Sequence, residues 1–381
     1  MITIVGAGPA GMAAAGSAVR CGAEVTVIDD NPAPGGQIWR GEGRTLAAGA
    51  VFIGQARVVS GDSGNRTLLV ETATGARNLS YDKLILATGS RELFLPFPGW
   101  TLPGVFGVGG LQALAKSGLP LRGKRIAVAG SGPLLLAGAA YFRKQGANVV
   151  LIAEQASITS VARFAAGLWR WPAKAGDALH LQTALLGVPQ RHGCWIESAE
   201  GEERVERLHF REGNNRFSIE VDYAAIAWGL VANNEIAALL ECPSVAGTGG
   251  AEVSAVEGEI AGLVAAGRDD LAQKLAPRRE KARRFAREID RCFALRPEIR
   301  ELPRPDTIVC RCEDVPFSRL QAFNSFRAAK LHTRCGMGPC QGRICGPAAR
   351  LLFGWRDESV RPPILPARVG TLAAPPAESG Q

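Results

Sequence analysis

The sequence predicts an α/β protein with two Rossmann-like nucleotide-binding domains and a small cysteine-rich domain. Three observations lead to this prediction. A strand, a glycine-rich turn, a helix and a second strand follow one another at the N-terminus, and the same order returns from residue 125. Five of the 9 cysteines gather between residues 310 and 345. Strands that alternate with helices are typical of a parallel sheet with helices on its faces.

The first unit reads MITIVGAGPAGMAAAGSAVRCGAEVTVIDD. Residues 2–5 suit a buried parallel strand, residues 10–19 are small and favour a helix, and residues 24–28 form the next strand. The pattern G-x-G-x-x-G between them lets the backbone approach a pyrophosphate, and an acid after the second strand suits a ribose hydroxyl. A glycine turn without a ligand is the alternative. The residues predicted to bind a nucleotide are Gly6, Gly8, Pro9, Ala10, Gly11, Asp29 and Asp30.

The second unit reads RIAVAGSGPLLLAGAAYFRKQGANVVLIAEQ. Gly130 and Gly132 repeat the first two glycines of the turn, but Leu135 replaces the third. A side chain at that position is expected to push the helix away from the strand and to reshape the phosphate site. The unit therefore predicts an NAD(P)-type domain with Gly130, Gly132 and Glu154 as binding residues. A vestigial domain that binds nothing remains the alternative.

The rest of the chain divides around these units. A strand over residues 84–87 leads into a turn, so Ala87, Thr88 and Gly89 are predicted to line the first site. Residues 191–222 alternate apolar and charged, which predicts antiparallel strands, and a glycine-started helix after residue 247 is expected to return to the first domain. The predicted domains are 1–115 with 235–300 for the first nucleotide, 116–234 for the second, 301–358 for the cysteines, and an extended tail over 359–381.

The cysteine spacing is Cys310-x-Cys312 followed by Cys340-x4-Cys345, with Cys335 standing apart. Thiolates select zinc or iron–sulfur clusters. Zinc sites usually have wider cysteine pairs at both ends and often a histidine, whereas a four-cysteine iron–sulfur cluster accepts an unusual spacing more easily. The pattern favours a 2Fe–2S cluster, with zinc or free cysteines as alternatives. Nearby glycines would let backbone N–H groups bond the sulfides, and nearby arginines would offset the charge of the cluster.

Composition limits the class of partner. The net charge is +8, but the arginines are scattered and no aromatic and basic module is present, so nucleic-acid binding is not expected. No apolar run is long enough to predict a membrane span. Clustered cysteines suit a reduced compartment, so the predicted location is the cytoplasm.

Seven stretches resemble the large flavoprotein subunits of hetero-oligomeric dye-linked dehydrogenases. They are GAGPAGMAAA, PAPGGQIWR, LILATGSRE, LPFPGWTLPGVFGVGGLQAL, AGSGPLLLA, VCRCEDV and TRCGMGPCQGRICGP. The family includes the large subunit of opine oxidase, the middle subunit of hydrogen cyanide synthase and the alpha subunit of D-hydroxyproline dehydrogenase. The resemblance implies a fold of the pyridine nucleotide-disulphide reductase type with an α-rich, BFD-like 2Fe–2S domain at the C-terminus.

The resemblance also implies site residues. The cluster ligands of the family fall on Cys310, Cys312, Cys340 and Cys345, and the family has no ligand at Cys335. Gly36 and Gln37 of the PGGQIW stretch support the flavin side of an FAD. Family members carry a Gly-Asp pair that binds the ribityl chain of FAD, but this chain runs from AALLECPSV directly into AGTGGAEVSAVEG. FAD is therefore expected at the first site, with ATP as the alternative, and the family implies FMN at a subunit interface.

The family implies that a partner subunit with its own FAD oxidises an amine or imino acid, of the opine, D-hydroxyproline, proline or glycine type. This chain would then relay electrons through the 2Fe–2S cluster to an acceptor, within a hetero-oligomer that can include a small ferredoxin-like subunit. No catalytic residue is predicted in this chain. Two alternatives are a self-contained NAD(P)H-dependent flavoprotein reductase and a non-enzymatic scaffold subunit whose nucleotide is structural.

Overall fold

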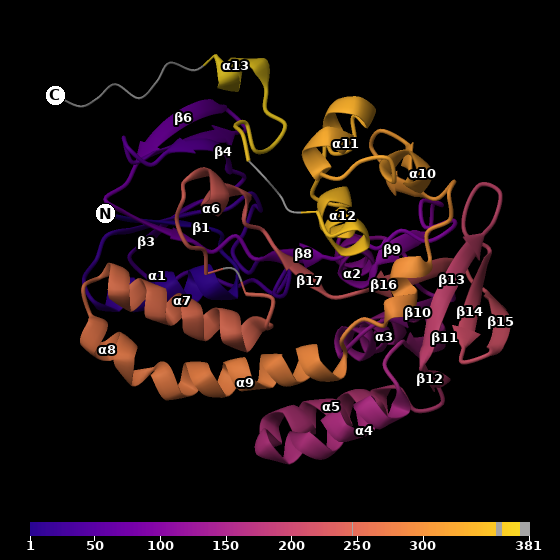
Figure 1. Cartoon of the computed structure of the whole chain (residues 1–381). Helices are drawn as coiled ribbons and strands as arrows, with labels where there is room; N and C mark the ends of the chain where they lie inside the picture. Colours follow the sequence, from indigo (N-terminus) through magenta and orange to yellow (C-terminus); the bar gives the residue numbers. More distant parts are fainter. Residues whose placement is uncertain (246, 356–359, 374–381) are drawn as a thin grey trace. The chain divides into compact units, whose positions relative to one another are not determined.

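The computed structural model describes residues 1–245, 247–355 and 360–373. The chain divides into two compact units. The first comprises residues 1–91, 231–286 and the described part of the C-terminal segment, and the second comprises residues 92–230 and the described residues from 287 to 355. Figure 1 follows the chain through both units.

A four-stranded parallel sheet with the strand order β3-β2-β1-β7 forms the centre of the first unit, and a three-stranded antiparallel sheet, β4-β5-β6, accompanies it. The elements of this unit are β1 (Ile2–Val5), α1 (Pro9–Arg20), β2 (Val25–Ile28), β3 (Ala50–Ile53), β4 (Arg57–Asp62), β5 (Thr67–Thr72), β6 (Gly75–Ser80), β7 (Lys83–Leu86), α6 (Glu235–Leu239), α7 (Ala251–Ala265), α8 (Asp269–Lys274) and α13 (Val369–Leu372). Every residue of β1 is buried, because the strand lies between two parallel neighbours.

Helix α7 packs directly on α1. The approach depends on small residues, since a Cβ atom added to Gly258 would lie 2.0 Å from the carbonyl oxygen of Ala10. Ala14 and Ala18 of α1 are fully buried in the same core. This contact brings the segment after residue 247 against α1 of the first unit.

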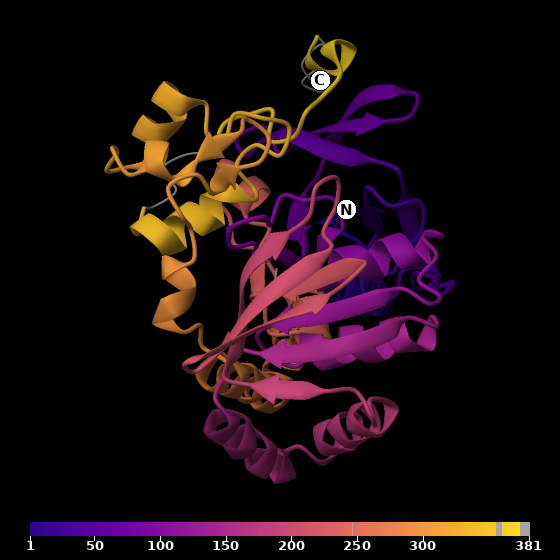
Figure 2. The same cartoon turned by 90° about the vertical axis from the view of Figure 1, so that its right-hand side faces the viewer.

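The second unit is built on a five-stranded parallel sheet with the order β12-β11-β10-β16-β9, and on an antiparallel sheet of β13, β14 and β15 (Figure 2). Its elements are β9 (Val105–Gly107), α2 (Val108–Lys116), β10 (Arg125–Gly130), α3 (Leu134–Lys144), β11 (Asn148–Glu154), α4 (Ile158–Gly167), η1 (Leu168–Arg170), α5 (Pro172–Ala184), β12 (Gln190–His192), β13 (Cys194–Glu200), β14 (Arg207–Glu212), β15 (Asn215–Glu220) and β16 (Tyr223–Ala227). The antiparallel strands predicted over residues 191–222 are confirmed.

Within the described residues, the chain passes between the units at three elements: β8 (Ser90–Glu92), β17 (Leu230–Ala232) and α9 (Ala276–Cys292). The 3-10 helix η2 (Pro297–Glu301) then leads into the cysteine region. This region contains β18 (Ile308–Cys310), β19 (Val315–Pro316), α10 (Phe317–Leu320), α11 (Phe326–Thr333) and α12 (Cys345–Phe353). Ala348 of α12 belongs to the same buried cluster as Trp195, and Trp100 Nε1 donates to the carbonyl oxygen of Ile308 at 2.6 Å.

The prediction of an extended tail over residues 359–381 is wrong for its described part. Residues 369–372 form α13, and Ile364 is buried in a cluster with Val58 and Leu68. Arg368 donates its backbone N–H to Glu71 at 2.9 Å. An apolar anchor and paired charges fix this segment, and neither feature has a periodic signal in the sequence. The rest of the predicted tail, residues 359 and 374–381, lies outside the described residues.

Within the described part of the chain, no helix combines the length and the apolar composition that a membrane crossing requires.

Candidate nucleotide and metal sites

The first glycine turn connects β1 to α1. Gly6 has a φ of +104°, and a Cβ atom added to Gly11 would lie 1.8 Å from the carbonyl oxygen of Gly6. At Gly8, in contrast, an added Cβ would meet only the Cα of Gly36, at 4.0 Å. The first and third glycines are therefore required by the fold, whereas the second leaves space above the turn. Helix α1 begins at Pro9, so its N-terminus points its unpaired N–H groups at that space.

Asp29 directly follows β2 and forms hydrogen bonds with the turn. Its carboxylate accepts the backbone N–H of Ala7 at 2.5 Å and that of Asn31 at 2.8 Å. Burial and then the charge of Asp29 raise the pKa of the neighbouring Asp30. The structure thus places Asp29 at the glycine turn, with Asp30 next in the chain. Their ribose contacts remain predictions.

Arg40 is a candidate binding residue that the sequence prediction did not include. It donates to the side chain of Asn31 at 2.9 Å, and its Nε atom is buried without a hydrogen-bond partner among the described residues. A guanidinium with a spare donor beside Asp30 suits an anionic group of a nucleotide. The sequence feature that could have indicated Arg40 as a binding residue is its position at the end of the PAPGGQIWR stretch.

The PGGQ stretch lies against the first turn. The N–H of Gly35 donates to the carbonyl oxygen of Ala7 at 2.8 Å, and a Cβ added to Gly36 would lie 2.9 Å from the Cα of Gly8. The structure therefore brings Gly36 to the predicted site, with Gln37 next in the chain. On the other side, the carbonyl oxygen of Ala87 lies against Gly6.

Thr88 and Gly89 follow β7, at the same edge of the sheet as the turn. The Thr88 hydroxyl donates to the carbonyl oxygen of Asn233 at 2.6 Å, and the Asn233 amide donates back to that of Thr88 at 2.9 Å. The chain comes back to β7 at Val245, whose N–H donates to the carbonyl oxygen of Leu86 at 2.7 Å. Helix α7 begins shortly afterwards, at Ala251. This short connection contains no Gly-Asp pair.

The second glycine turn connects β10 to α3. A Cβ added to Gly130 would lie 1.9 Å from the carbonyl oxygen of Ala227, and Glu154 accepts the N–H of Gly132 at 2.7 Å and that of Ala156 at 2.8 Å. Leu135 is buried in the hydrophobic cluster beneath α3. The predicted residues Gly130, Gly132 and Glu154 therefore lie together. Nucleotide binding by them remains a prediction.

Glu154 should make the stability of the protein depend on pH. Burial raises its pKa from the ordinary 4.5 to about 7. The folded state therefore holds the proton more tightly, so this group's stabilising contribution is complete below pH 4.5 and is lost as the pH rises to about 7. At about 1.4 kcal/mol per pKa unit, the free energy of unfolding should fall by up to about 3 kcal/mol across this window.

Urea denaturation at pH 5 and pH 7.5 will measure this effect. Glu154→Gln should flatten the pH dependence relative to the unmodified protein. Glu202→Gln, at an exposed position, is the matched control and should leave the dependence unchanged. Parallel pH profiles for Glu154→Gln and the unmodified protein would contradict the prediction.

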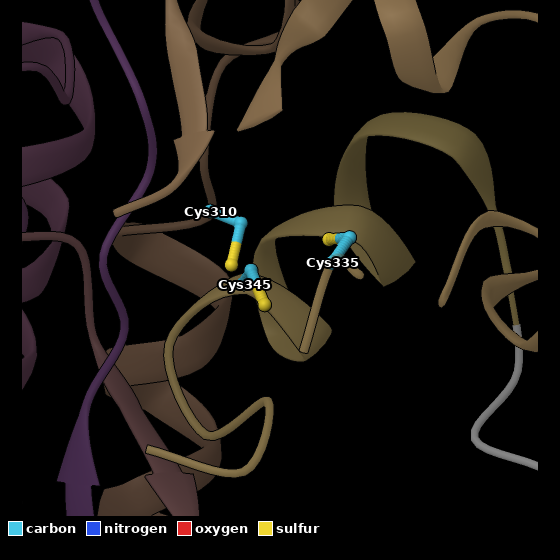
Figure 3. Close-up of side chains that lie close together, drawn as sticks. All are labelled: Cys310, Cys335 and Cys345. Atoms are coloured by element: carbon cyan, nitrogen blue, oxygen red, sulfur yellow. The ribbon is translucent and has the colours of Figure 1, made fainter. Parts of the chain in front are cut away.

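Three cysteines converge in the cysteine region (Figure 3). Cys310 ends β18, Cys335 follows α11 and Cys345 begins α12. Their sulfur atoms all lie within 4.8 Å of one another, and each residue is at most 1% exposed. Hydrogen bonds from the Cys335 and Cys345 thiols lower the pKa of Cys310 to about 2, and the N–H of Gly336 donates to its sulfur at 3.5 Å. A thiolate, the form that binds metals, is therefore favoured at Cys310, whereas hydrogen bonds to Cys310 raise the pKa values of the Cys335 and Cys345 thiols.

Cys312 and Cys340 form a second group. The backbone N–H of Cys340 donates to Cys312, and the two thiols are hydrogen-bonded. Gly338 lies against this pair, because an added Cβ would be 2.3 Å from the Cβ of Cys312. Of the four ligands predicted from the family, Cys310 and Cys345 thus lie in the buried trio and the other two in this half-exposed pair. Cys335, predicted not to be a ligand, lies in the trio.

Several charged or titratable side chains of the cysteine region make local contacts. Arg334 pairs with Glu313 at 2.6 Å, and Arg343 donates to the carbonyl oxygen of Cys340 at 3.3 Å. His332 stacks on Phe323, with ring centroids 5.4 Å apart. These contacts are structural, and the absence of a catalytic residue from this chain stays a prediction.

Comparisons with known proteins extend these findings. Residues 1–253 match the pyridine nucleotide-disulphide oxidoreductase family. The chain is 29% identical over 451 residues to the opine oxidase A subunit of Rhizobium meliloti, in an alignment that covers 97% of each chain. It is also 29% identical over 418 residues to the hydrogen cyanide synthase subunit HcnB of Pseudomonas aeruginosa, in an alignment that covers 90% of each chain. The solved structure of L-proline dehydrogenase from P. horikoshii matches 98% of this chain and 79% of that one, with a TM-score of 0.68 and 18% identity. The first alignment is longer than the 381 residues of this chain, so that relative contains segments that this chain lacks.

Proposed function

Since this chain belongs to the pyridine nucleotide-disulphide oxidoreductase family, we propose that it is the electron-transfer subunit of a flavin-dependent amine or imino-acid dehydrogenase complex. The names of its relatives support this proposal, because the opine oxidase and hydrogen cyanide synthase proteins that it resembles are subunits of larger enzymes. The substrate would be of the opine, D-hydroxyproline, proline or glycine type. It would be oxidised on a partner subunit, and this chain would receive the electrons.

The observation that carries the proposal is the gathering of five cysteines in the cysteine region, three of them buried together. Cys310, Cys335 and Cys345 bring three sulfur atoms within 4.8 Å of one another, and the Cys312–Cys340 pair belongs to the same segment. Four thiolates hold a 2Fe–2S cluster, which when bound would take up and release one electron at a time. We assign the ligands to Cys310, Cys312, Cys340 and Cys345. The N–H of Gly336 and the glycines around it would supply hydrogen bonds to sulfur.

The first glycine turn suits the adenylate part of a dinucleotide. The space above Gly8, the braced Asp29 and the spare donor of Arg40 would hold the phosphates and ribose. FAD, if bound, would supply a second redox centre. The short connection between Val245 and α7 offers no Gly-Asp pair for a ribityl chain, so ATP is the alternative occupant.

The partner would be a catalytic, FAD-containing beta subunit, with a small ferredoxin-like subunit as a third component and FMN at a subunit interface. The test is to purify the native complex without oxygen and to screen the four substrate types with a dye acceptor. We expect about two iron atoms and two sulfides per chain, turnover by the complex, and reduction of the iron–sulfur spectrum by substrate. Turnover by the partner alone, at the rate of the complex, would contradict the relay.

A scaffold role is the second candidate, and the missing Gly-Asp pair favours it. In that case the nucleotide would only stabilise the fold. Removing the bound nucleotide would then leave turnover by intact complex unchanged while new complex failed to assemble. Mass analysis of the nucleotide released by denaturation would decide between FAD and ATP.

A further inference from the structure

A short segment of the chain itself covers the second glycine turn. Residues 293–296 follow α9 and precede η2, in the same unit as β10 and β11. The hydroxyl of Ser131, the residue between the two glycines, donates to the carbonyl oxygen of Phe293 at 2.8 Å. The segment therefore lies on the part of the turn where a pyrophosphate approaches a Rossmann-like domain.

Gln155 holds this segment in place through hydrogen bonds. It is fully buried, and its amide nitrogen donates to Ser131 Oγ at 2.9 Å and to the carbonyl oxygen of Ala294 at 3.1 Å. Its amide oxygen accepts the backbone N–H of Arg296 at 3.0 Å. The Gln155 side chain thus both donates a hydrogen bond to the segment and accepts one from it, so the donor and the acceptor of this buried amide each have a partner.

Phe293 fills the space above the turn. A Cβ atom added to Gly132 would lie 3.9 Å from both Cβ and Cγ of Phe293, which is ordinary packing contact. The Phe293 ring also packs edge-on against Phe164, with centroids 5.1 Å apart. At the corresponding place above the first turn, the neighbour of Gly8 is Gly36, which has no side chain.

The chemistry of the second turn also opposes a phosphate. The N–H of Ser131 donates to Ala227 at 2.7 Å, and that of Gly132 donates to Glu154. The groups that face the turn from the segment are carbonyl oxygens of Phe293 and Ala294, which accept hydrogen bonds as phosphate oxygens do. An anionic ligand would therefore meet the carbonyl oxygens of this segment, which are acceptors, where it needs donors.

We propose that residues 293–296 form an internal plug that closes the second dinucleotide site, with Gln155 as the residue that positions the plug. The chain then takes no reducing equivalents from NADH or NADPH at this site. The plug also ties the segment that leads into the cysteine region to the end of β11. It involves only the second site, so its tests give the same answer whether or not the iron–sulfur relay exists.

The test begins with the intact, unmodified chain. Titration with NADH and with NADPH, with the first site filled by FAD or ATP and binding followed by nucleotide fluorescence, should show no saturable binding up to about 1 mM, the upper end of ordinary enzyme affinities. Hydrogen–deuterium exchange should show the amide of Arg296 protected, because its acceptor is a buried side chain. Saturable binding of either nucleotide, or an Arg296 amide that exchanges as fast as an exposed loop, would overturn the proposal.

Two variants test the role of Gln155. Gln155→Glu removes the donors to Ser131 and Ala294 and places a carboxylate oxygen against the carbonyl oxygens of Phe293 and Ala294, which repel it. Exchange across residues 293–296 should therefore become at least about tenfold faster while circular dichroism shows an intact fold. Gln182→Glu, an exposed glutamine of α5, is the matched control and should leave exchange unchanged. Equal protection of the segment in both variants would overturn the assignment of Gln155 as the residue that positions the plug. If Gln155→Glu does not fold, the titration and the exchange measurement on the unmodified chain still test the plug.

Discussion

Cys345→Ala should abolish iron binding by this protein. Cys345 is 1% exposed and its sulfur lies with those of Cys310 and Cys335, so the substitution removes one thiolate from the buried centre of the site. A cluster held by four thiolates does not tolerate the loss of one without another ligand to replace it. Iron and sulfide should fall from about two each per chain to near zero, and the visible and electron paramagnetic resonance spectra should disappear.

Two further substitutions make this experiment specific. Cys21→Ala lies in the first unit, at the end of α1, and should leave the iron content unchanged. Cys335→Ala should retain iron if the ligands are Cys310, Cys312, Cys340 and Cys345. An iron loss in Cys335→Ala equal to that in Cys345→Ala would place Cys335 in the ligand set, and full iron content in Cys345→Ala would contradict the proposed site.

Gly8→Ala should separate nucleotide binding from folding at the first site. The φ of Gly8 is −78°, which alanine adopts freely, and the added Cβ would meet only Gly36 at 4.0 Å. The fold should therefore be kept, while the methyl group enters the space that a pyrophosphate needs. We expect the bound nucleotide to fall at least about tenfold, which corresponds to about 1.4 kcal/mol, with little change in melting temperature.

Gly11→Ala should instead lower both the nucleotide content and the stability of the fold. Its Cβ would lie 1.8 Å from the carbonyl oxygen of Gly6, so α1 must move away from β1, at a cost of about 1–3 kcal/mol of stability or more. Gly16→Ala, in the same helix, is the matched control, because its nearest neighbour is the flexible end of Arg20 at 3.4 Å. The measurements are mass analysis of the released nucleotide and thermal unfolding. Equal nucleotide content in Gly8→Ala and the unmodified protein would contradict a pyrophosphate at this turn.

Local patterns were sufficient to predict much of the fold. The apolar run at residues 2–5 and the glycine turn after it predicted β1 and the start of α1 to within about a residue. The alternation over residues 191–222 predicted the antiparallel strands, because a two-residue period is itself the geometry of a strand. Cysteines cannot be explained by packing alone, so their clustering drew attention to the region around Cys345.

The structure decided how residues distant in the sequence meet. Cys335 joins Cys310 because the turn after α11 faces β18, and nothing in the spacing of the cysteines expresses that contact. The C-terminal segment is anchored by Ile364 in the core of the first unit, although its composition suggested an extended chain.

The sequence by itself determined that this protein has two βαβ units and a cysteine region, since strands, helices and glycine turns follow from neighbours within a few residues of one another. Only the tertiary structure decided which of the two glycine turns is open. Gln155 and residues 293–296 are about 140 positions apart and meet over the second turn through hydrogen bonds. No periodic pattern in the sequence indicates these hydrogen bonds. Side-chain contacts of that range depend on how the whole unit packs, which is why a turn that resembles a dinucleotide site in sequence is covered in the folded protein.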